Sequence, residues 1–231
     1  AHAPMEPQNA TVHVRDGEVE IWAPTQSQTV TQEVAARIVG VGRRDVIVHT
    51  TLQGGGFGRR LGPDVVAEAV LVAREVDRPV QLVWSREDDT RGGYYRPLNH
   101  NRVEAAVDSD GNPVAWRYHH VSPPMLVDWD PFIAAAIPNW IPKATRQVLA
   151  NSVYGLSRAG SVPELLAMEG AEPPYDVDSV RLEYTPVDTP IPVCSWRSVG
   201  NSYNGFVVES FIDELAHNAD AEPGEYRRRL L

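Results

Sequence analysis

Four glycines occupy five consecutive positions in Gly54-Gly55-Gly56-Phe57-Gly58, and this run constrains the fold more than any other feature of the chain. A β-branched run precedes it and predicts a strand over residues 45–51. Asp64 follows it and begins a pattern of apolar residues at helical spacing. The sequence therefore predicts a strand, a glycine turn and a helix, with backbone amides that a ligand can approach closely.

Two common glycine loops do not fit this run. A phosphate-binding P-loop ends in Gly-Lys-Ser/Thr, whereas Gly58 is followed by Arg59 and Arg60. A dinucleotide-binding fingerprint requires a further glycine where this chain has Arg59 or Leu61. A tight strand-to-helix turn without any ligand stays open as the structural alternative.

The first 85 residues predict one layered module of strands and helices. Alternating runs over 11–15 and 18–22 flank Asp16-Gly17 and predict a β-hairpin. Apolar spacing predicts a helix over 28–39 that stops at Gly40. A strand over 79–84 follows the helix that begins at Asp64, which indicates a parallel crossover.

The remaining sequence predicts a second hairpin, an irregular stretch and further elements. Strands are expected over 102–107, 113–120 and 177–184, and helices over 203–218 and from Pro223. Residues 122–174 are rich in Pro, Ala, Trp and Gly and predict irregular chain with one or two short helices. We expect an α+β fold of mixed β-sheet layers with packed helices, divided into 1–121, 122–176 and 177–231.

The composition excludes several classes of partner and cofactor. A formal net charge of −10 repels phosphate backbones and anionic lipids, so nucleic acid is not an expected partner. The single cysteine, Cys194, excludes disulfides and Cys-ligated iron-sulfur clusters within this chain. No apolar stretch reaches the roughly 18 residues of a membrane span. The sequence assigns no compartment, and cytoplasm and periplasm both stay open.

Three patches together resemble a known family. The glycine run with Phe57 is similar to the molybdenum-site loop of the xanthine oxidase and aldehyde oxidoreductase family. Gln26, in Ala23-Pro24-Thr25-Gln26, and Ser195-Trp196-Arg197 match two further segments of its molybdenum-cofactor-binding subunit. The Arg59-Arg60-Leu61 continuation is similar to the branch that contains the isoquinoline 1-oxidoreductase beta subunit. The resemblance implies the fold of a molybdenum-cofactor-binding domain.

The resemblance also implies roles for individual residues. It implies cofactor binding by Gln26, Gly55, Gly56, Phe57, Gly58 and Arg197. It implies a substrate pocket formed by Phe57, Ser195, Trp196 and Val199. No residue is expected to ligate the metal directly. An amide such as Gln26 suits an oxygen of the metal centre, because its NH₂ group donates while its carbonyl accepts.

The implied activity is hydroxylation of an N-heteroaromatic or aldehyde substrate with water as the oxygen source. The cofactor is expected to be a molybdopterin in its cytosine dinucleotide form, with iron-sulfur clusters on a partner subunit. Family subunits are much longer than 231 residues, and no Gly-x-Gly-Glu segment with their general-base Glu occurs here. The rest of the large subunit is thus an expected partner, and this fragment alone is expected to be inactive. Leu61 replaces a substrate-binding Glu of purine-oxidising relatives, and Val199 replaces an aromatic residue, which disfavours xanthine.

Other interpretations of the same residues stay open. The chain is alternatively a non-catalytic scaffold of such a complex, or a glycine-loop module that binds another anionic ligand through Arg59 and Arg60. His2 and Glu6 lie in a His-x-x-x-Glu-Pro stretch that the family shares, but they are too few to form a metal site. We expect these two side chains to pack or to form hydrogen bonds.

Overall fold

The computed structural model describes residues 1–125, 135–138, 140–158 and 164–231. Its strands are β1 (Asn9–Arg15), β2 (Glu18–Ala23), β3 (Val46–Thr50), β4 (Val80–Val83), β5 (His100–Val107), β6 (Pro113–Ser122) and β7 (Ser179–Pro186). Its helices are α1 (Gln28–Val39), α2 (Asp64–Val76), α3 (Arg86–Arg91), α5 (Lys143–Arg158), α6 (Leu165–Met168), α7 (Asn201–Asn218) and α8 (Pro223–Leu230), with short 3-10 helices η1 (Arg43–Asp45) and η2 (Arg59–Leu61). No helix within these residues has the length and apolar content needed to cross a membrane.

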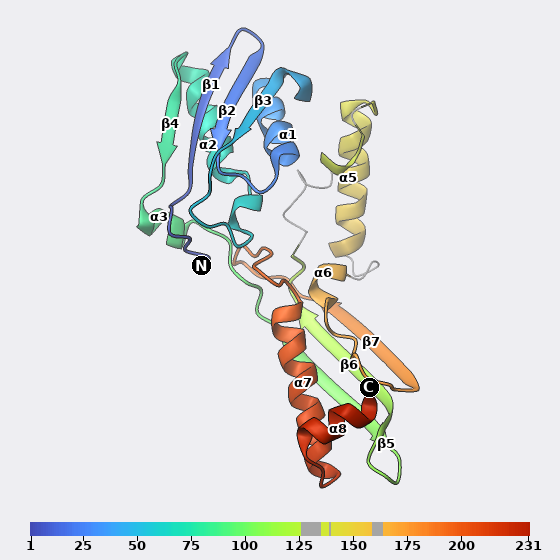
Figure 1. Cartoon of the computed structure of the whole chain (residues 1–231). Coiled ribbons are helices and arrows are strands. Elements are labelled where there is room, and N and C mark those ends of the chain that lie inside the picture. Colours follow the sequence, from blue (N-terminus) through green and yellow to red (C-terminus); the bar gives the residue numbers. More distant parts are fainter. Residues whose placement is uncertain (126–134, 139, 159–163) are drawn as a thin grey trace. The chain divides into compact units, whose positions relative to one another are not determined.

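The chain divides into two compact units, each with its own sheet (Figure 1). Unit 1 comprises Ala1–Arg96, Asp128–Tyr154 and Ile191–Trp196. Unit 2 comprises Pro97–Val127, Gly155–Pro190 and Arg197–Leu231. Each unit is thus assembled from three separate stretches of the chain.

Unit 1 is built on a four-stranded sheet in the order β3-β2-β1-β4. β1 and β2 form the predicted hairpin, and β2 pairs in parallel with β3. Helices α1 and α2 cover one face of this sheet (Figure 1). Side chains alternate between the two faces of a strand, so Val12, Ile21 and Val46 point toward the helices and are buried. The predicted hairpin and the predicted first two long helices are confirmed.

β4 lies at the edge of the sheet and pairs with β1 in antiparallel fashion. Since β1 is also antiparallel to β2, and β2 is parallel to β3, β4 runs in the same direction as β3. The connection through α2 therefore joins two parallel strands, as the sequence predicts. The hairpin β1-β2 lies between these two strands in the sheet.

A buried carboxylate, Glu33 on α1, gathers three arginines in unit 1. Its oxygens lie 2.9 Å from Arg37 Nε, 3.5 Å from Arg43 Nε and 3.1 Å from Arg146 Nη1. These cations come from α1, η1 and α5, so one carboxylate connects three elements. The side chain of Glu33 is only 4% exposed, and its charge is stabilised because the arginines replace the water that it has lost.

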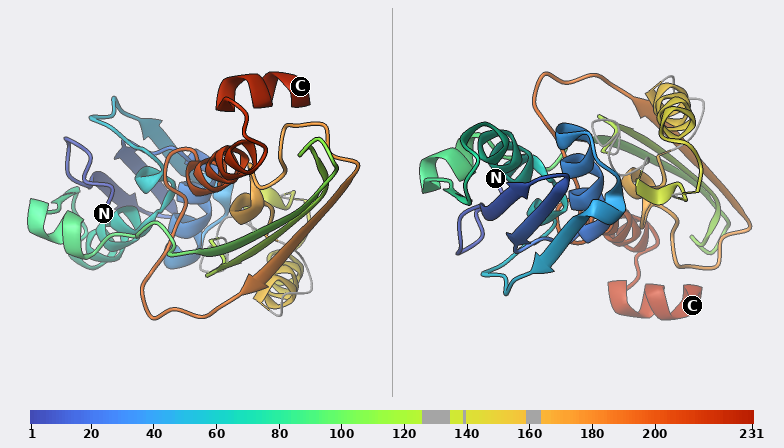
Figure 2. Two further views of the ribbon diagram at one scale, coloured as in Figure 1. Left: turned by 90° about the horizontal axis from the view of Figure 1, so that it is seen from below. Right: turned by 90° about the horizontal axis from the view of Figure 1, so that it is seen from above.

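Unit 2 contains a three-stranded sheet in the order β5-β6-β7. β5 and β6 form the second predicted hairpin, and β7 pairs in parallel with β6. Figure 2 shows α7 lying along one face of this sheet. Trp116 and Tyr118 of β6 and Ile212 of α7 are buried in one hydrophobic cluster. Mixed sheets with helices packed on one face confirm the predicted α+β class.

A histidine at the end of β6 is completely buried in unit 2. His120 Nδ1 lies 2.5 Å from Asn101 Oδ1, which only accepts hydrogen bonds, so this ring nitrogen is the donor. Its Nε2 lies 2.9 Å from Ser122 Oγ and accepts the hydroxyl proton. The ring stacks on Tyr184 and on Tyr203, at 6.0 Å and 5.2 Å between centroids. A neutral imidazole satisfies every one of these contacts.

The stretch 122–174 differs from the expectation of irregular chain with short helices. α6 is short, but α5 is a 16-residue helix. Among the α5 side chains that the structure describes, Arg146 and Ala150, one turn apart, are buried, whereas apolar side chains such as Val148 and Leu149 are exposed. Because an arginine anchors the buried face, the apolar spacing that predicts helices is weak here. The parts of this stretch at 126–134, 139 and 159–163 lie outside the described residues.

Replacement of Glu33 by Gln is expected to destabilise unit 1. The change leaves three arginines around a neutral amide, and breaking such a buried pair costs about 3 kcal/mol. Urea unfolding followed by tryptophan fluorescence measures the free energy of unfolding. Glu18→Gln, at an exposed hairpin position, is the matched control and is expected to change it by less than about 0.5 kcal/mol. Equal effects of the two substitutions would contradict the role of Glu33.

Unit 2 is expected to lose stability as the pH falls from 6.5 toward 4. Burial, followed by the neighbouring charge of His119, lowers the pKa of His120 from 6.5 to about 4. Between these values the unfolded chain binds a proton that the folded chain does not, which favours unfolding by roughly 2 to 3 kcal/mol. Unfolding curves at several pH values should show this slope, and His120→Gln should remove most of it. If the pH dependence is unchanged in His120→Gln, or if His119→Gln removes it as well, a group other than His120 is responsible.

Candidate functional site

Two loops of unit 1 leave the sheet at the same edge. β2 and β3 are parallel neighbours, and Ala23 pairs with Thr50 at their carboxyl ends. The chain after β2 continues to Gln26, and the chain after β3 continues to the glycine run. In sheets with parallel strands, ligands bind outside the carboxyl ends of these strands. The pairing therefore brings two of the three sequence patches to one place.

Hydrogen bonds from both backbone and side chains connect these two loops. Gln26 donates its backbone N–H to the Arg60 carbonyl oxygen at 3.0 Å. Gly58 donates its backbone N–H to Gln26 Oε1 at 3.0 Å. Gln53 Nε2 donates to the Thr25 carbonyl oxygen at 2.8 Å. Both the backbone and the side chain of Gln26 are thus held by the glycine loop.

The bond from Gly58 also fixes the orientation of the Gln26 amide. Its carbonyl oxygen is the atom that accepts from Gly58, so the NH₂ group points the other way. In the part of the chain that the structure describes, this NH₂ group has no protein acceptor, and the residue is exposed. The site consequently presents a fixed donor to whatever lies beside the loop.

Glycine is required at Gly56 and Gly58 because each lies against a neighbouring segment of the site. Gly58 has φ 97°, and an added Cβ would lie 2.4 Å from the Ser195 carbonyl oxygen. At Gly56 an added Cβ would lie 2.6 Å from Gln26 Oε1 and would push the amide away. The loop therefore packs directly on Gln26 on one side and on Ser195 on the other.

Phe57, at the tip of the loop, has a backbone conformation that residues other than glycine rarely adopt. Its φ is 55° and it is 43% exposed, and an added Cβ at Gly55 would lie 3.0 Å from Phe57 Cε2, so the partly exposed ring lies against Gly55. Within the described residues, the backbone N–H groups of Gly55, Gly56 and Phe57 have no protein acceptor. The tip thus combines an exposed ring with a row of available donors, which suits a ligand rich in acceptor atoms.

The two arginines after the loop are internal rather than ligand-facing. Arg59 is 1% exposed and makes two bonds to Asp64, at 2.8 Å and 2.5 Å, while its guanidinium lies over the rings of Trp84 and Tyr94. Arg60 is 3% exposed and lies 2.9 Å from Glu6 Oε2. Their charges are neutralised inside the fold, so the alternative of an anion held by Arg59 and Arg60 loses its cations.

The third patch reaches the loop through Ser195 and Trp196. The chain at Val193 forms a parallel bridge with Tyr95, and Cys194 N–H donates to the Tyr95 carbonyl oxygen at 2.9 Å. This bridge carries Ser195, which is buried, to the position where its carbonyl oxygen contacts Gly58. Gln26, Gly55, Gly56, Phe57, Gly58, Ser195 and Trp196 therefore come together in unit 1.

Arg197 and Val199 belong to unit 2 and are described with it. They stand just before α7, and Ser202 Oγ donates to the Arg197 carbonyl oxygen at 3.1 Å. Ser198 and Val199 have φ values of 68° and 44°, which is unusual for a β-branched residue such as Val199. Strained backbone of this kind clusters at functional segments. The assigned roles of both residues stay predictions.

Two residues to which the sequence assigns no chemistry, His2 and Glu6 of the N-terminal segment, contact the site. His2 is buried, and its ring stacks on Trp196 with 4.8 Å between centroids. Glu6 Oε2 accepts the Gly54 N–H at 2.8 Å. The His-x-x-x-Glu-Pro spacing was the available signal, and packing and hydrogen bonding are the roles it predicted. What the sequence did not indicate is which partners these side chains contact.

Cys194 is an inert part of the same segment. It is fully buried, and burial raises the pKa of its thiol to about 12. Because a thiolate is the reactive form of cysteine, this thiol is unreactive at neutral pH.

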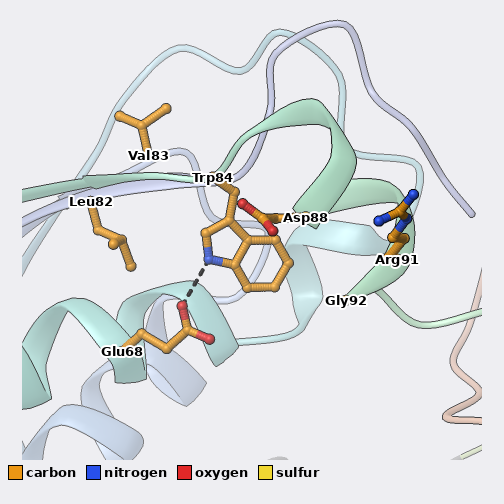
Figure 3. A pocket seen from close by; sticks show the side chains of 7 residues that line it. All are labelled: Glu68, Leu82, Val83, Trp84, Asp88, Arg91 and Gly92. Atoms are coloured by element: carbon orange, nitrogen blue, oxygen red, sulfur yellow. Dashed lines mark hydrogen bonds between the residues drawn. The ribbon is translucent and has the colours of Figure 1, made fainter.

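A pocket of about 610 Å³ opens elsewhere on unit 1, beside β4 (Figure 3). Its lining residues are Glu68, Leu82, Val83, Trp84, Asp88, Arg91 and Gly92. The indole N–H of Trp84 donates to Glu68 Oε2 at 2.8 Å, as the dashed line in Figure 3 marks. None of the predicted cofactor or substrate residues lines this pocket, so it is separate from the loop site.

Known proteins resemble this chain over its whole length. Residues 1–124 match the model of a protein family described as the molybdopterin cofactor-binding domain. The beta subunit of isoquinoline 1-oxidoreductase from Brevundimonas diminuta is 32% identical over 227 residues, which cover 97% of this chain and 26% of that protein. One subunit of the nicotinate dehydrogenase from Pseudomonas putida is 28% identical over 233 residues, which cover 100% of this chain and 18% of that protein. The chain thus spans about a quarter or less of these relatives.

A solved structure shares the fold. Quinoline 2-oxidoreductase from Pseudomonas putida 86 superposes with a TM-score of 0.76 and 22% identity, over 100% of this chain and 27% of that chain. The family match and this fold likeness confirm the resemblance that the three sequence patches predict.

Substitution of Gly58 by Ala is expected to disrupt the loop. The methyl group would meet the Ser195 carbonyl oxygen and the left-handed φ would be strained, for a combined cost of about 3 kcal/mol in the free energy of unfolding. Gly17→Ala is the matched control, because Gly17 has φ 81° with nothing within 4 Å of an added Cβ. It isolates the backbone strain at about 1 kcal/mol. Equal losses in urea unfolding would show that Gly58 makes no tight contact with Ser195.

Proposed function

Because the chain belongs to the molybdopterin cofactor-binding domain family, we propose that it is part of a molybdenum-dependent oxidoreductase subunit and that its loop site holds the cofactor. Gln26 and the backbone of Gly55–Gly58 are the cofactor-facing groups of this proposal. Phe57, Ser195 and Trp196 line the substrate side. Arg197 and Val199 are assigned to the same site by their positions in the family motif.

The hydrogen bond from Gly58 to Gln26 Oε1 carries this assignment. It leaves the Gln26 NH₂ group as a fixed donor beside the unpaired N–H groups of the loop tip. Oxygen ligands of a metal centre and the heteroatoms of a pterin are acceptors, so this donor set matches them. An added Cβ at Gly56 would displace the amide, which explains why the loop is made of glycine. The residues present fit the cofactor.

When bound, the molybdenum cofactor supplies two-electron oxidation chemistry, with water as the source of the oxygen atom. The side chains and backbone of this chain bind the cofactor and orient it. Gln26 donates to an oxygen atom of the cofactor, and the backbone N–H groups of Gly55, Gly56 and Phe57 hold it in place without a net charge. Phe57 also offers an aromatic face against which a planar substrate packs.

An N-heteroaromatic ring is the proposed substrate class. The relatives described above are named for isoquinoline, nicotinate and quinoline, each of which contains such a ring. Leu61 supplies no carboxylate for a purine, and Val199 is smaller than an aromatic residue, so both positions favour a bulky ring of low polarity. An aldehyde is the alternative substrate, and turnover of isoquinoline against benzaldehyde distinguishes the two.

The proposal extends to the parts of the enzyme beyond these residues. We assign the general-base Glu to another part of the large subunit, since the matched residues cover only 26% and 18% of the two relatives. The electrons pass to iron-sulfur clusters on a partner subunit, and the pterin carries a cytosine dinucleotide. Two of the relatives are themselves named as subunits, which supports an assembly of several subunits.

Gln26→Glu in the intact subunit tests the proposal. Glutamate keeps an oxygen that accepts from Gly58 but replaces the outward NH₂ donor by a negative oxygen, which repels the acceptor atoms of the cofactor. We expect the molybdenum and pterin content of the purified subunit to fall about tenfold or more, with unfolding unchanged. Gln81→Glu, on the exposed edge strand, is the control. Full molybdenum and pterin content in Gln26→Glu would refute the assignment of Gln26.

A further inference from the structure

The N-terminal segment Ala1–Gln8 contacts both the glycine loop and the Ser195–Trp196 segment. We propose that Glu6 and His2 are two positioning residues with separate tasks: Glu6 holds the glycine loop in shape for the cofactor, and His2 holds Ser195 and Trp196 in place for the substrate. This inference rests on the proposed function. Neither residue touches the cofactor or the substrate in this proposal, and each acts through the segment that it holds.

Glu6 holds the base of the glycine loop from one side. Its backbone N–H donates to the Gly54 carbonyl oxygen at 3.1 Å, and its Oε2 accepts the Gly54 N–H at 2.8 Å. Gly54 is therefore held at both of its polar atoms by one residue. An added Cβ at Gly54 would lie 2.4 Å from Glu6 Cβ, so the two residues are in direct contact.

Arg60 closes the same arrangement from the other end of the loop. Its Nη2 donates to both the carbonyl oxygen and Oε2 of Glu6, at 2.8 Å and 2.9 Å, and its Nε donates to the Gly55 carbonyl oxygen at 2.8 Å. Glu6 and Arg60 thus tie both ends of the 54–60 loop together. Bonds of this charge-assisted kind are stronger than neutral ones, so the loop is held in one conformation before any ligand binds.

The charge of Glu6 is stabilised where it lies. Burial opposes the charged form, but the Gly54 N–H, the Asn9 amide and Arg60 together lower the pKa of Glu6 below its usual value. Asn9 Nδ2 donates to Glu6 Oε1 at 2.8 Å, so both carboxylate oxygens are engaged. The carboxylate offers two charged oxygens to Gly54, Asn9 and Arg60, whereas a neutral amide at this position offers one oxygen and weaker, uncharged hydrogen bonds.

His2 holds the other segment. Its Nε2 lies 3.3 Å from the Ser195 carbonyl oxygen and its Nδ1 lies 3.2 Å from the Tyr94 carbonyl oxygen. The ring also stacks on Trp196, whose indole lies 5.2 Å from the Arg96 guanidinium. His2 is 7% exposed, and burial is the main influence that lowers its pKa. Both carbonyl oxygens only accept, so a ring nitrogen that carries a proton donates to the carbonyl group that it faces.

The position of Ser195 decides how close the third patch comes to the loop. Its carbonyl oxygen already touches Gly58, so this segment cannot move inward. The bond and the stacking from His2 prevent it from moving outward. Loss of the His2 nitrogens therefore frees Ser195 and Trp196 while the contacts of Glu6 with the loop remain. Loss of the Glu6 charge frees the glycine loop, while the contacts of His2 with Ser195 and Trp196 remain.

The test compares His2→Phe and Glu6→Gln in the intact subunit with the controls His13→Phe and Glu18→Gln. Phe keeps a flat ring against Trp196 and removes both polar contacts. Hydrogen exchange of the Cys194 and Gly58 amides reports on the two segments, because each donates a bond at the site. Molybdenum and pterin content are measured on the same samples, and KM and kcat are measured with isoquinoline.

We expect His2→Phe to accelerate exchange at Cys194 about tenfold, which corresponds to one lost hydrogen bond, and to raise KM with cofactor content unchanged. We expect Glu6→Gln to accelerate exchange at Gly58 about tenfold and to lower cofactor content. Rescue of exchange and KM in His2→Gln, which restores a donor, would further support the role of the His2 nitrogens.

The inference is overturned if both substitutions accelerate exchange equally at both amides, or if neither exceeds its control. It is also overturned if His2→Phe lowers cofactor content while KM stays the same. The failure of the proposed function looks different: a wild-type subunit that carries no molybdenum and no pterin contradicts that function, while the exchange rates still decide whether Glu6 and His2 hold separate segments. If isoquinoline is not oxidised, the exchange rates and the cofactor content alone decide whether Glu6 and His2 hold separate segments.

Discussion

The parallel pairing of β2 with β3 is the constraint on which the site depends. It sends two loops out of the sheet at one edge and places Gln26 beside the glycine run. The bond from Gly58 then turns the Gln26 amide so that its donor faces outward. A local backbone requirement for glycine and a long-range strand pairing are thus combined in one arrangement, and neither alone would bring the Gln26 amide beside the glycine run.

The charged side chains around the glycine loop stabilise the fold and do not face a ligand. Arg59 pairs with Asp64, and Arg60 pairs with Glu6, so the glycine loop gains rigidity from ion pairs that face inward. What it presents outward is a set of neutral N–H groups and the ring of Phe57. Donors held in place before binding need no reorganisation when the ligand arrives. Internal ion pairs combined with neutral donors at the surface suit a cofactor that carries its own charge and supplies the redox chemistry.

Local signals account for what the sequence predicts well. Asp16-Gly17 predicts the first hairpin and Gly40 the end of α1, because each needs only the conformational preference of nearby residues. The glycine run predicts a backbone-lined site for the same reason. Long-range partners are different. That Arg60 would bond Glu6 rather than a ligand, and that Arg146 would anchor α5, depends on residues far away in the sequence, which spacing does not reveal. The roles of the individual site residues remain predictions.

The distance from Gln26 Nε2 to the nearest oxygen of the cofactor, in an experimental structure of the intact complex, tests the central claim most directly. The account predicts a hydrogen bond of about 3 Å, with the cofactor also within reach of the backbone N–H groups of Gly55, Gly56 and Phe57. A cofactor bound elsewhere, with Gln26 and the loop tip facing only solvent or protein, would contradict it.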